Sequence, residues 1–266
     1  MSTNPYEAPQ AVVADYEPVR VAGGQLGAPR RRPAGRGAAW FGEGWVLFRR
    51  APGLWIGIFV VMAALLIAAG FVPLAGFIAQ GVVTPVLWAG VMVGCAAQER
   101  GEPLQFAHLF AGFSVHTGQL VLAGVLYTVA LLLVMLIAFV PTVGLAAGFA
   151  MFGGGEPAGL FESADGLLLF LLAMLVYMAL AVPLMMAIWF APALIVLDGV
   201  PAPAAMKLSF LGCLKNIVPF LIYGLVGLAL AIAATVPLLL GWLVLGPLIY
   251  ITSYVAYREI FFADAG

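Results

Sequence analysis

One stripe of hydroxyl-bearing side chains near the carboxyl end of the chain has a spacing that could do chemistry. Tyr250, Ser253, Tyr254 and Tyr257 recur at i, i+3, i+4 and i+7, so a helix would place them on one face. Such a face could line a small cavity or a groove for lipid headgroups. The simpler interpretation, which we favour, puts Tyr254 and Tyr257 in the aromatic belt at a membrane surface and bonds Ser253 to a neighbouring helix.

The other residues that commonly carry chemistry lack partners at useful spacing. His108 and His116 have no acidic or cysteine neighbour at the spacing of metal ligands. Cys95 and Cys213 are far apart in the sequence and have no pairing or ligand pattern around them. The short motifs of serine hydrolases, zinc proteases and phosphate-binding loops are also missing from the sequence. We therefore expect a protein that is not an enzyme and that uses no cofactor or metal ion.

Composition indicates the surroundings in which these residues must fold. Of the 266 residues, 64% are hydrophobic and 9% are charged. A soluble globular protein carries about 45–50% apolar and about 25% charged residues. Because so few charges cannot cover a surface that faces water, most of the chain must lie in lipid. The sequence predicts an all-α fold, a polytopic membrane helix bundle.

Six uncharged apolar segments are long enough to cross the hydrocarbon core, which takes about 20 helical residues. The last two nearly merge, and Pro237 and Gly241 mark the turn between them. A proton-coupled carrier would normally need an ionisable residue in a span, and these segments have none. Together they form a membrane domain over residues 38–262. The predicted spans are residues 53–72, 77–97, 119–140, 167–190, 217–236 and 238–257.

The basic residues indicate how these spans are oriented. With six spans, all 11 Lys and Arg residues fall on the side of both termini. Basic residues stay on the cytoplasmic side of a membrane, so we expect both termini to be cytoplasmic in a bacterial inner membrane. Residues 1–37, which include Arg30-Arg31-Arg32, have no apolar run and should form a disordered basic arm. The acidic, Gly-rich residues 141–166 should form a flexible periplasmic loop.

A short amphipathic segment precedes each pair of spans on the predicted cytoplasmic side. Helices of this kind lie in the headgroup region, with apolar side chains inward and cations toward lipid phosphates. We therefore expect the partners to be the lipid bilayer, anionic headgroups at the cytoplasmic face and other membrane proteins, but no nucleic acid. The apolar residues of the segments are Phe41, Trp45 and Phe48; Phe106, Leu109, Phe110 and Phe113; and Met206, Phe210, Cys213 and Leu214.

The spacing of prolines and glycines repeats along the chain. Pro85 precedes Gly101 by the same interval as Pro183 precedes Gly199, and a Val-Pro pair closes the first span of each predicted hairpin. Fixed spacing is the signature of duplicated units, although a chain rich in Val, Pro and Gly produces some matches by coincidence. The pattern predicts an internal triplication of helical hairpins, each preceded by an interfacial helix and all oriented alike.

Small residues and prolines mark places where the predicted spans could pack closely or bend. Small side chains let helix backbones approach in lipid, and the candidate packing positions are Gly90, Gly94, Gly224, Gly227 and Ala231. Proline interrupts the helical hydrogen-bond ladder, and the candidate kinks are Pro85, Pro183 and Pro247. These prolines could be hinges of a moving bundle. We interpret them as static kinks whose freed carbonyls are satisfied by neighbouring groups.

Several short motifs are spread along the chain. They are Asn4-Pro5-Tyr6-Glu7-Ala8-Pro9, of the form Asn-Pro-Tyr-x-Ala-Pro, and residues 51–55, 100–104, 108–113, 191–194 and 205–210. As a set they resemble a family of uncharacterised bacterial multi-pass inner-membrane proteins. The resemblance covers most of the chain and implies a multi-span protein of the cytoplasmic membrane. It supplies no activity, substrate or site residue.

Two functional hypotheses follow from these expectations. The first is a non-catalytic protein that acts through membrane or protein association in the cell envelope, based on the missing catalytic motifs and the one-sided amphipathic segments. The second is a passive transporter or lipid-handling protein with a cavity among the three hairpins, based on the hydroxyl stripe and the prolines. A cavity beside Tyr250 and Ser253 with room for a lipid or solute would favour the second hypothesis, whereas a tight bundle would favour the first.

Overall fold

The computed structural model describes residues 26–71, 75–153 and 164–262, and these ranges contain helices and no strand. The predicted all-α class is therefore confirmed for the described part of the chain. The elements in order are α1 (Arg36–Phe48), α2 (Pro52–Gly70), α3 (Ala75–Glu99), the 3-10 helix η1 (Phe106–Phe113), α4 (Thr117–Gly153), α6 (Ala164–Trp189), α7 (Ala191–Asp198), α8 (Ala202–Lys215), α9 (Ile217–Thr235) and α10 (Trp242–Phe261).

Among the described residues, five helical segments are long and apolar enough to cross a membrane. They are Pro52–Gly70, Gly76–Glu99, Thr117–Pro141, Gly166–Asp198 and Ile217–Thr235. The sixth predicted span, residues 238–257, falls mostly on α10, which is not among the five. α10 carries Arg258 and Glu259 in its last turn, and most of its side chains are buried. Its polar residues therefore face other parts of the protein rather than lipid.

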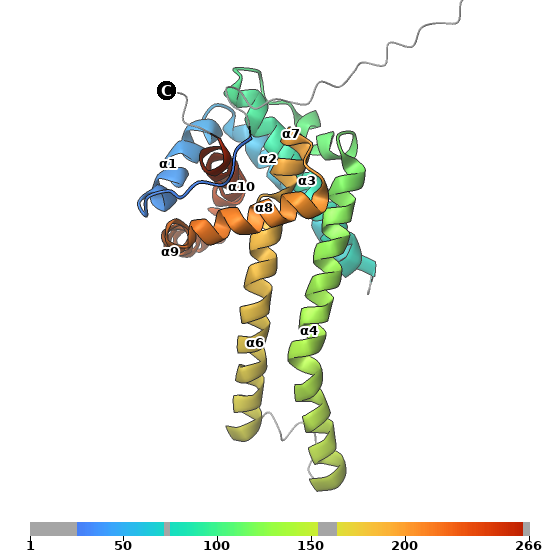
Figure 1. The fold of residues 1–266 in the computed structure, drawn as a ribbon. Helices are drawn as coiled ribbons and strands as arrows, with labels where there is room; N and C mark the ends of the chain where they lie inside the picture. The colour runs from blue at the N-terminus through green and yellow to red at the C-terminus, as the bar shows by residue number, and fades with distance from the viewer. Residues whose placement is uncertain (1–25, 72–74, 154–163, 263–266) are drawn as a thin grey trace, which may run out of the picture.

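The helices form two regions of different shape (Figure 1). α4 and α6 pack against each other and extend away from the rest of the chain as a long pair, which we call the hairpin. The other helices gather at one end of that pair, and we call this group the head. α8 packs across the end of α6 that lies nearest the head. Glu99, Asp198 and Glu259 all belong to the head.

Large aromatic side chains form much of the core of the head. Six of them are fully buried: Trp40, Trp55, Phe190, Tyr254, Tyr257 and Phe261. Burying an aromatic side chain of this size removes roughly 150–250 Å² from solvent and stabilises the fold by about 1.5–3 kcal/mol. Because these rings come from α1, α2, α10 and the start of α7, they join segments from both ends of the sequence.

The hairpin exposes large apolar side chains, whereas the head buries its aromatic side chains. Leucines along α4 and α6 are exposed, including Leu133, Leu136, Leu168 and Leu175, the last with 66% of its area accessible. A contiguous apolar surface of this extent marks a membrane or partner contact rather than a surface in water. The hairpin therefore has the surface expected of a segment that is dissolved in lipid.

Residues 26–37 of the predicted disordered arm have a defined structure. The backbone amide of Arg30 donates to the carbonyl of Ile260 at 2.9 Å. Asn216, a buried residue at the start of α9, accepts from the Arg32 amide and donates to the Arg30 carbonyl, both at 2.8 Å. Residues 26–35 are thus held against the ends of α8 and α10, although their composition is typical of disorder.

The predicted acidic loop over residues 141–166 is shorter in the structure. α4 continues as a helix through Pro141 to Gly153, and α6 begins at Ala164. Glu156 and Glu162 lie outside the described residues, as does the N-terminal Asn-Pro-Tyr motif. The sequence suggested that the span ends at Pro141. The structure shows instead that the helix continues past this proline.

The predicted packing face of α3 contacts η1. A Cβ atom at Gly90 would lie 2.1 Å from the carbonyl oxygen of Leu109, and one at Gly94 would lie 2.9 Å from the side chain of Leu104. Both distances are too short for a side chain. Glycine is therefore required at Gly90 because the backbone of η1 lies directly on α3.

The small residues of α9 make looser contacts. A Cβ atom at Gly224 would meet open space, and one at Gly227 would lie 3.5 Å from the ring of Phe41 in α1. Ala231 is partly buried against the core. This face of α9 therefore receives α1 rather than another span. The three candidate kinks lie inside helices, with Pro85 in α3, Pro183 in α6 and Pro247 in α10.

Candidate functional site

Three carboxylates lie at or near the carboxyl ends of helices in the head. Glu99 ends α3, Asp198 ends α7 and Glu259 lies in the last turn of α10. The carboxyl end of a helix carries partial negative charge, so an acid there is unfavourable unless another group donates to it. Each of the three carboxylates therefore needs a donor from elsewhere in the chain.

An aromatic side chain supplies a donor to each acid. The hydroxyl of Tyr254 donates to Glu99 Oε2 at 2.5 Å, and the hydroxyl of Tyr257 donates to Asp198 Oδ2. The indole of Trp40 in α1 donates to Glu259 Oε2 at 2.6 Å. These bonds connect α10 to α3 and α7, and α1 to α10. The same chemical device thus recurs at all three acids.

The structure divides the predicted hydroxyl stripe into two parts. Tyr254 and Tyr257 lie in the protein interior, 1% and 0% exposed, rather than in an aromatic belt that faces lipid. Ser253 accepts from the indole of Trp88 in α3 at 3.3 Å, so it does bond to a neighbouring helix. Tyr250 packs edge-on against Trp88, with ring centroids 5.2 Å apart. The stripe therefore holds α10 against its neighbours.

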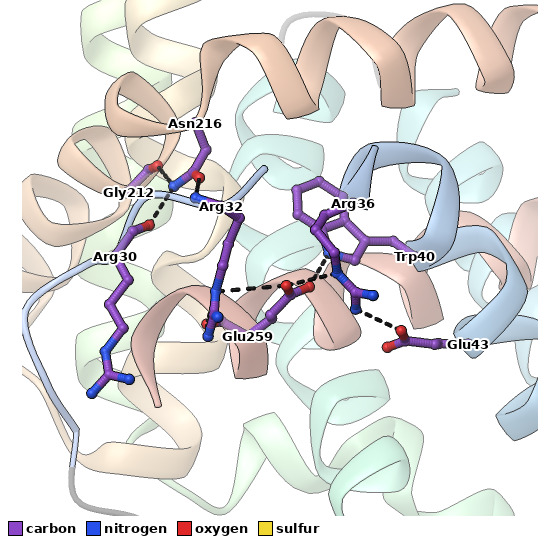
Figure 2. Close-up of polar contacts among 8 residues, drawn as sticks. All are labelled: Arg30, Arg32, Arg36, Trp40, Glu43, Gly212, Asn216 and Glu259. Atoms are coloured by element: carbon purple, nitrogen blue, oxygen red, sulfur yellow. Dashed lines mark hydrogen bonds and ion pairs between the residues drawn. The ribbon is translucent and has the colours of Figure 1, made fainter. Parts of the chain in front are cut away.

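Two arginines reinforce the contact at Glu259 (Figure 2). Arg36 donates through Nε to Glu259 Oε1 at 2.7 Å and through Nη2 to Glu43 Oε1 at 2.5 Å. Arg32 donates to the backbone carbonyl of Glu259 at 2.8 Å. Hydrogen bonding to the carboxylate of Glu259 raises the pKa of Arg36 above its ordinary value. Glu259 therefore joins the N-terminal segment, α1 and α10.

A second group of charges lies at the end of α3. Arg258 forms an ion pair with Glu99. Arg50 donates to the carbonyl of Gln98 at 2.6 Å, and the indole of Trp55 donates to the Gln98 side chain at 3.2 Å. The end of α3 is thus held both by α10 and by the connection between α1 and α2.

These charges border a cavity of about 510 Å³ between α1, α10 and the end of α3. Its volume lies within the range of roughly 300–1,000 Å³ that is typical of ligand sites. The charged residues that line it are Arg36, Arg50, Arg258, Glu43, Glu99 and Glu259. Since the two signs are equal in number, the cavity is formally neutral although it is strongly polar.

The region beside Tyr250 has almost no free space. The void that it borders measures about 10 Å³, which is barely enough for one water molecule. The ring centroid of Trp189 lies 5.7 Å from that of Trp88 and 6.1 Å from that of Phe220, so aromatic rings fill the space between α3, α6 and α9. The space that Tyr250 borders is therefore too small for the lipid or solute of the second hypothesis.

Comparison with known proteins identifies one relative. Over 206 residues the chain is 30% identical to a probable inner membrane protein of Burkholderia thailandensis, a match that covers 75% of this chain and 74% of the relative. The chain belongs to the family of that protein. It is accordingly a multi-pass protein of the bacterial inner membrane, in agreement with its five apolar helices. No family model and no solved structure matches the chain.

Sequence reasoning missed the residues that form this site in the inner-membrane protein. Glu99, Asp198 and Glu259 each follow an apolar segment closely, and the charges there were explained by orientation alone. The available signal was their repeated position: an acid follows the second span of every predicted hairpin. Trp40 could not have been paired with Glu259 from the sequence, because 219 residues separate them.

The histidines do not gather with metal ligands in the described residues. No group of three or more His, Cys, Asp or Glu side chains there could hold a metal ion. His108 instead accepts the backbone amide of Gln105 through Nδ1 at 3.1 Å, as part of the cap of η1. Burial lowers the pKa of His108, which favours the neutral ring that this bond requires.

Proposed function

We propose that the protein is a non-catalytic component of the inner membrane that acts by associating with the membrane and with other membrane proteins of the cell envelope. The observation that carries this proposal is the internal pairing of the acids in the head. Glu99, Asp198 and Glu259 each accept a hydrogen bond from a buried aromatic residue. A catalytic acid or base must instead be free to reach a substrate.

A transport function finds less support at the centre of the protein. The rings of Trp189 and Tyr250 each pack edge-on against that of Trp88 between α3, α6 and α10, and this packing argues against a solute path at that point. Lipid handling remains the second candidate because of a mostly apolar cleft of about 280 Å³ between α3, α4 and α6. Pro85 and Tyr127 border this cleft, which is large enough for part of an acyl chain.

The proposed topology has six spans, with both termini and the basic residues on the cytoplasmic side. α10, with 20 residues, would measure about 30 Å, which matches the thickness of the hydrocarbon core. Residues 141–166 then connect the second pair of spans on the periplasmic side. Reporter fusions at both termini should behave as cytoplasmic, and a fusion at Gly154 should behave as periplasmic. A periplasmic signal from either terminus would contradict this topology.

We also propose that the chain is an internal triplication of hairpins that closes on itself. The supporting observation is a shared packing pattern: η1 packs on α3, α8 packs on α6, and α1 packs on α10. Each of these elements precedes one predicted hairpin and contacts the second helix of another, so the first element closes against the last. If the three units form a closed ring, a circular permutant should still insert and fold. In this permutant residue 262 is joined to residue 26, and the new termini lie at residue 102. Loss of the folded protein in this circular permutant would argue against the closed ring.

Photocrosslinking can test the association directly. Leu175 in α6 and Leu225 in α9 are 66% and 67% exposed, whereas Ala173 and Tyr223, two residues away on the same helices, are buried. A photoreactive residue at the exposed positions should crosslink to other membrane proteins in cells, and the buried positions should crosslink only within the chain. Crosslinks confined to lipid, together with release of entrapped solute from proteoliposomes, would favour transport over association.

A further inference from the structure

The cavity in the head has two ends of opposite charge. Arg50, Arg258 and Glu99 surround the end near α3, which therefore carries a formal charge of about +1. Arg36, Glu43 and Glu259 line the other end, and these lining residues carry about −1; Arg32, which does not line the cavity, also pairs with Glu259 at 3.6 Å, so the acceptor of this end that faces the cavity is Glu43. A lining that has arginines at one end and an accessible carboxylate at the other is complementary to a zwitterion.

The positive end has donors that a phosphate could use. Arg258 pairs with Glu99, but its Nε is buried and has no hydrogen-bond partner among the described residues. Arg50 is exposed and donates to the Gln98 carbonyl, which is a neutral acceptor. Guanidinium groups bind phosphate oxygens through several parallel hydrogen bonds. A phosphate placed between Arg50 and Arg258 could accept from the accessible parts of the two guanidinium groups, since both side chains line the cavity and the Arg258 side chain is 28% exposed.

The negative end has an acceptor that remains accessible. The side chain of Glu43 is 50% exposed and pairs with Arg36. Glu43 lies in α1 and Arg50 lies two residues beyond the end of that helix, and both line the cavity. Since each side chain reaches inward, a headgroup whose two charges are a few bonds apart can contact both.

We propose that this cavity binds a phosphoethanolamine group, with its phosphate at Arg50 and Arg258 and its ammonium at Glu43. The N–H groups of a primary ammonium can donate to the Glu43 carboxylate, which a quaternary choline cannot do. A phosphatidylglycerol headgroup would leave the negative end without a cation. Val46, Leu47 and Phe262 also line the cavity, so apolar surface is available for the part of a lipid next to its phosphate.

The first experiment compares lipids on the unaltered protein. Native mass spectrometry of the delipidated protein in detergent micelles would titrate phosphatidylethanolamine, phosphatidylcholine and phosphatidylglycerol of equal chain length. Phosphatidylethanolamine should bind about tenfold more tightly than either of the other two lipids. This is the factor expected for the one additional charge-assisted hydrogen bond that its ammonium makes. Equal binding of the three lipids, or tighter binding of phosphatidylglycerol, would overturn the proposal.

A soluble competitor separates the two sources of this group. If the cavity recognises the headgroup alone, millimolar glycerophosphoethanolamine should displace bound phosphatidylethanolamine. If the glycerol and acyl carbons contribute through Val46 and Leu47, the competitor should fail while the intact lipid still binds selectively. Both results support a phosphoethanolamine site and differ only in whether the free or the membrane-anchored group is recognised.

Paired variants then test the two ends of the cavity. Arg50→Gln should weaken the binding of phosphatidylethanolamine and of phosphatidylglycerol alike, by about tenfold. Arg49→Gln is its control because Arg49 is exposed but does not line the cavity.

Glu43→Gln should weaken the binding of phosphatidylethanolamine alone and so abolish the preference for this lipid. Its control, Glu102→Gln, removes an equally exposed ion-paired acid outside the cavity. Unchanged lipid preference in Glu43→Gln would overturn the assignment, and a folded control variant excludes a general loss of structure.

Discussion

In the head, the end of α10 is surrounded by polar partners, whereas in the hairpin α4 and α6 expose leucines along most of their length. The two regions therefore satisfy different solvents. The head places carboxylates, arginines and hydroxyls against one another because the protein interior provides no water to solvate them. The hairpin needs no such partners, since hydrocarbon itself solvates its side chains.

The comparison shows which changes each region should tolerate. In the head, removal of one partner leaves another polar group buried and unsatisfied, which costs more than the bond itself contributed. In the hairpin, one apolar residue can replace another, but a charge has no partner and no water. The two regions should thus respond in opposite ways to the same kind of substitution.

The largest effect is expected from a charge placed in the hairpin. Leu175→Lys, near the centre of α6, puts an ammonium on an exposed apolar surface, and a lysine at the centre of a span costs about 2.5–3.5 kcal/mol of insertion free energy. The measured fraction of inserted protein should fall sharply. The control is Leu214→Lys in α8, which is also exposed but lies next to Lys215 in the head. Equal loss of insertion in both variants would remove the distinction between the two regions.

A somewhat smaller effect is expected when Glu259 loses its charge. Glu259→Gln removes the anion that Arg36 and Trp40 share, and the side chain is only 12% exposed. Breaking a fully buried pair costs about 3–5 kcal/mol, so about 2 kcal/mol is expected for this partly exposed network. Thermal unfolding in detergent should show a lower midpoint. Glu102→Gln, which breaks the exposed pair with Arg100, should leave the midpoint unchanged, and a similar drop in both variants would contradict the special role of Glu259.

Much of the hairpin and of the apolar spans could be predicted from the sequence, because the signal is local. Spans predicted at 53–72 and 217–236 coincide closely with α2 (Pro52–Gly70) and α9 (Ile217–Thr235). An uncharged segment of the right length has few alternatives in lipid. α10 differs from these spans. Its sequence predicts a span that faces lipid, but most of its side chains are buried against other helices.

The site could not be predicted, because its contacts join distant parts of the chain. Arg32 reaches the carbonyl of Glu259 across 227 positions, and Tyr254 reaches Glu99 across 155 positions. Basic residues near the spans had a sufficient explanation in membrane orientation, so nothing in the sequence required them to have partners. The ordered segment at 26–35 was missed for the same reason, since its bonds depend on Asn216 and Ile260 rather than on its own composition.

Glycine substitutions sharpen the comparison within the apolar helices. Gly90→Ala would force a methyl group against the carbonyl of Leu109 in the head, where overpacking costs about 1–3 kcal/mol, so about 1.5 kcal/mol of stability should be lost. Gly224→Ala meets open space and should stabilise α9 by about 0.5–1 kcal/mol. Unfolding midpoints of the two variants should therefore move in opposite directions. An unchanged or raised midpoint in Gly90→Ala would contradict the close contact with η1, and a lowered midpoint in Gly224→Ala would contradict the open space beside α9.

The smallest effect is a pH dependence confined to the head. Burial lowers the pKa of His108 below its ordinary value of 6.5, so on acidification the unfolded chain binds a proton before the folded one does. Stability should then fall as the pH drops through about 6.5 and level off below the folded pKa. Protonation also removes the Nδ1 acceptor that caps η1.

Unfolding midpoints at pH 7.5 and 5.5 should differ more for the native protein than for His108→Gln, which cannot titrate. An equal pH dependence in both proteins would assign the effect to titratable groups other than His108.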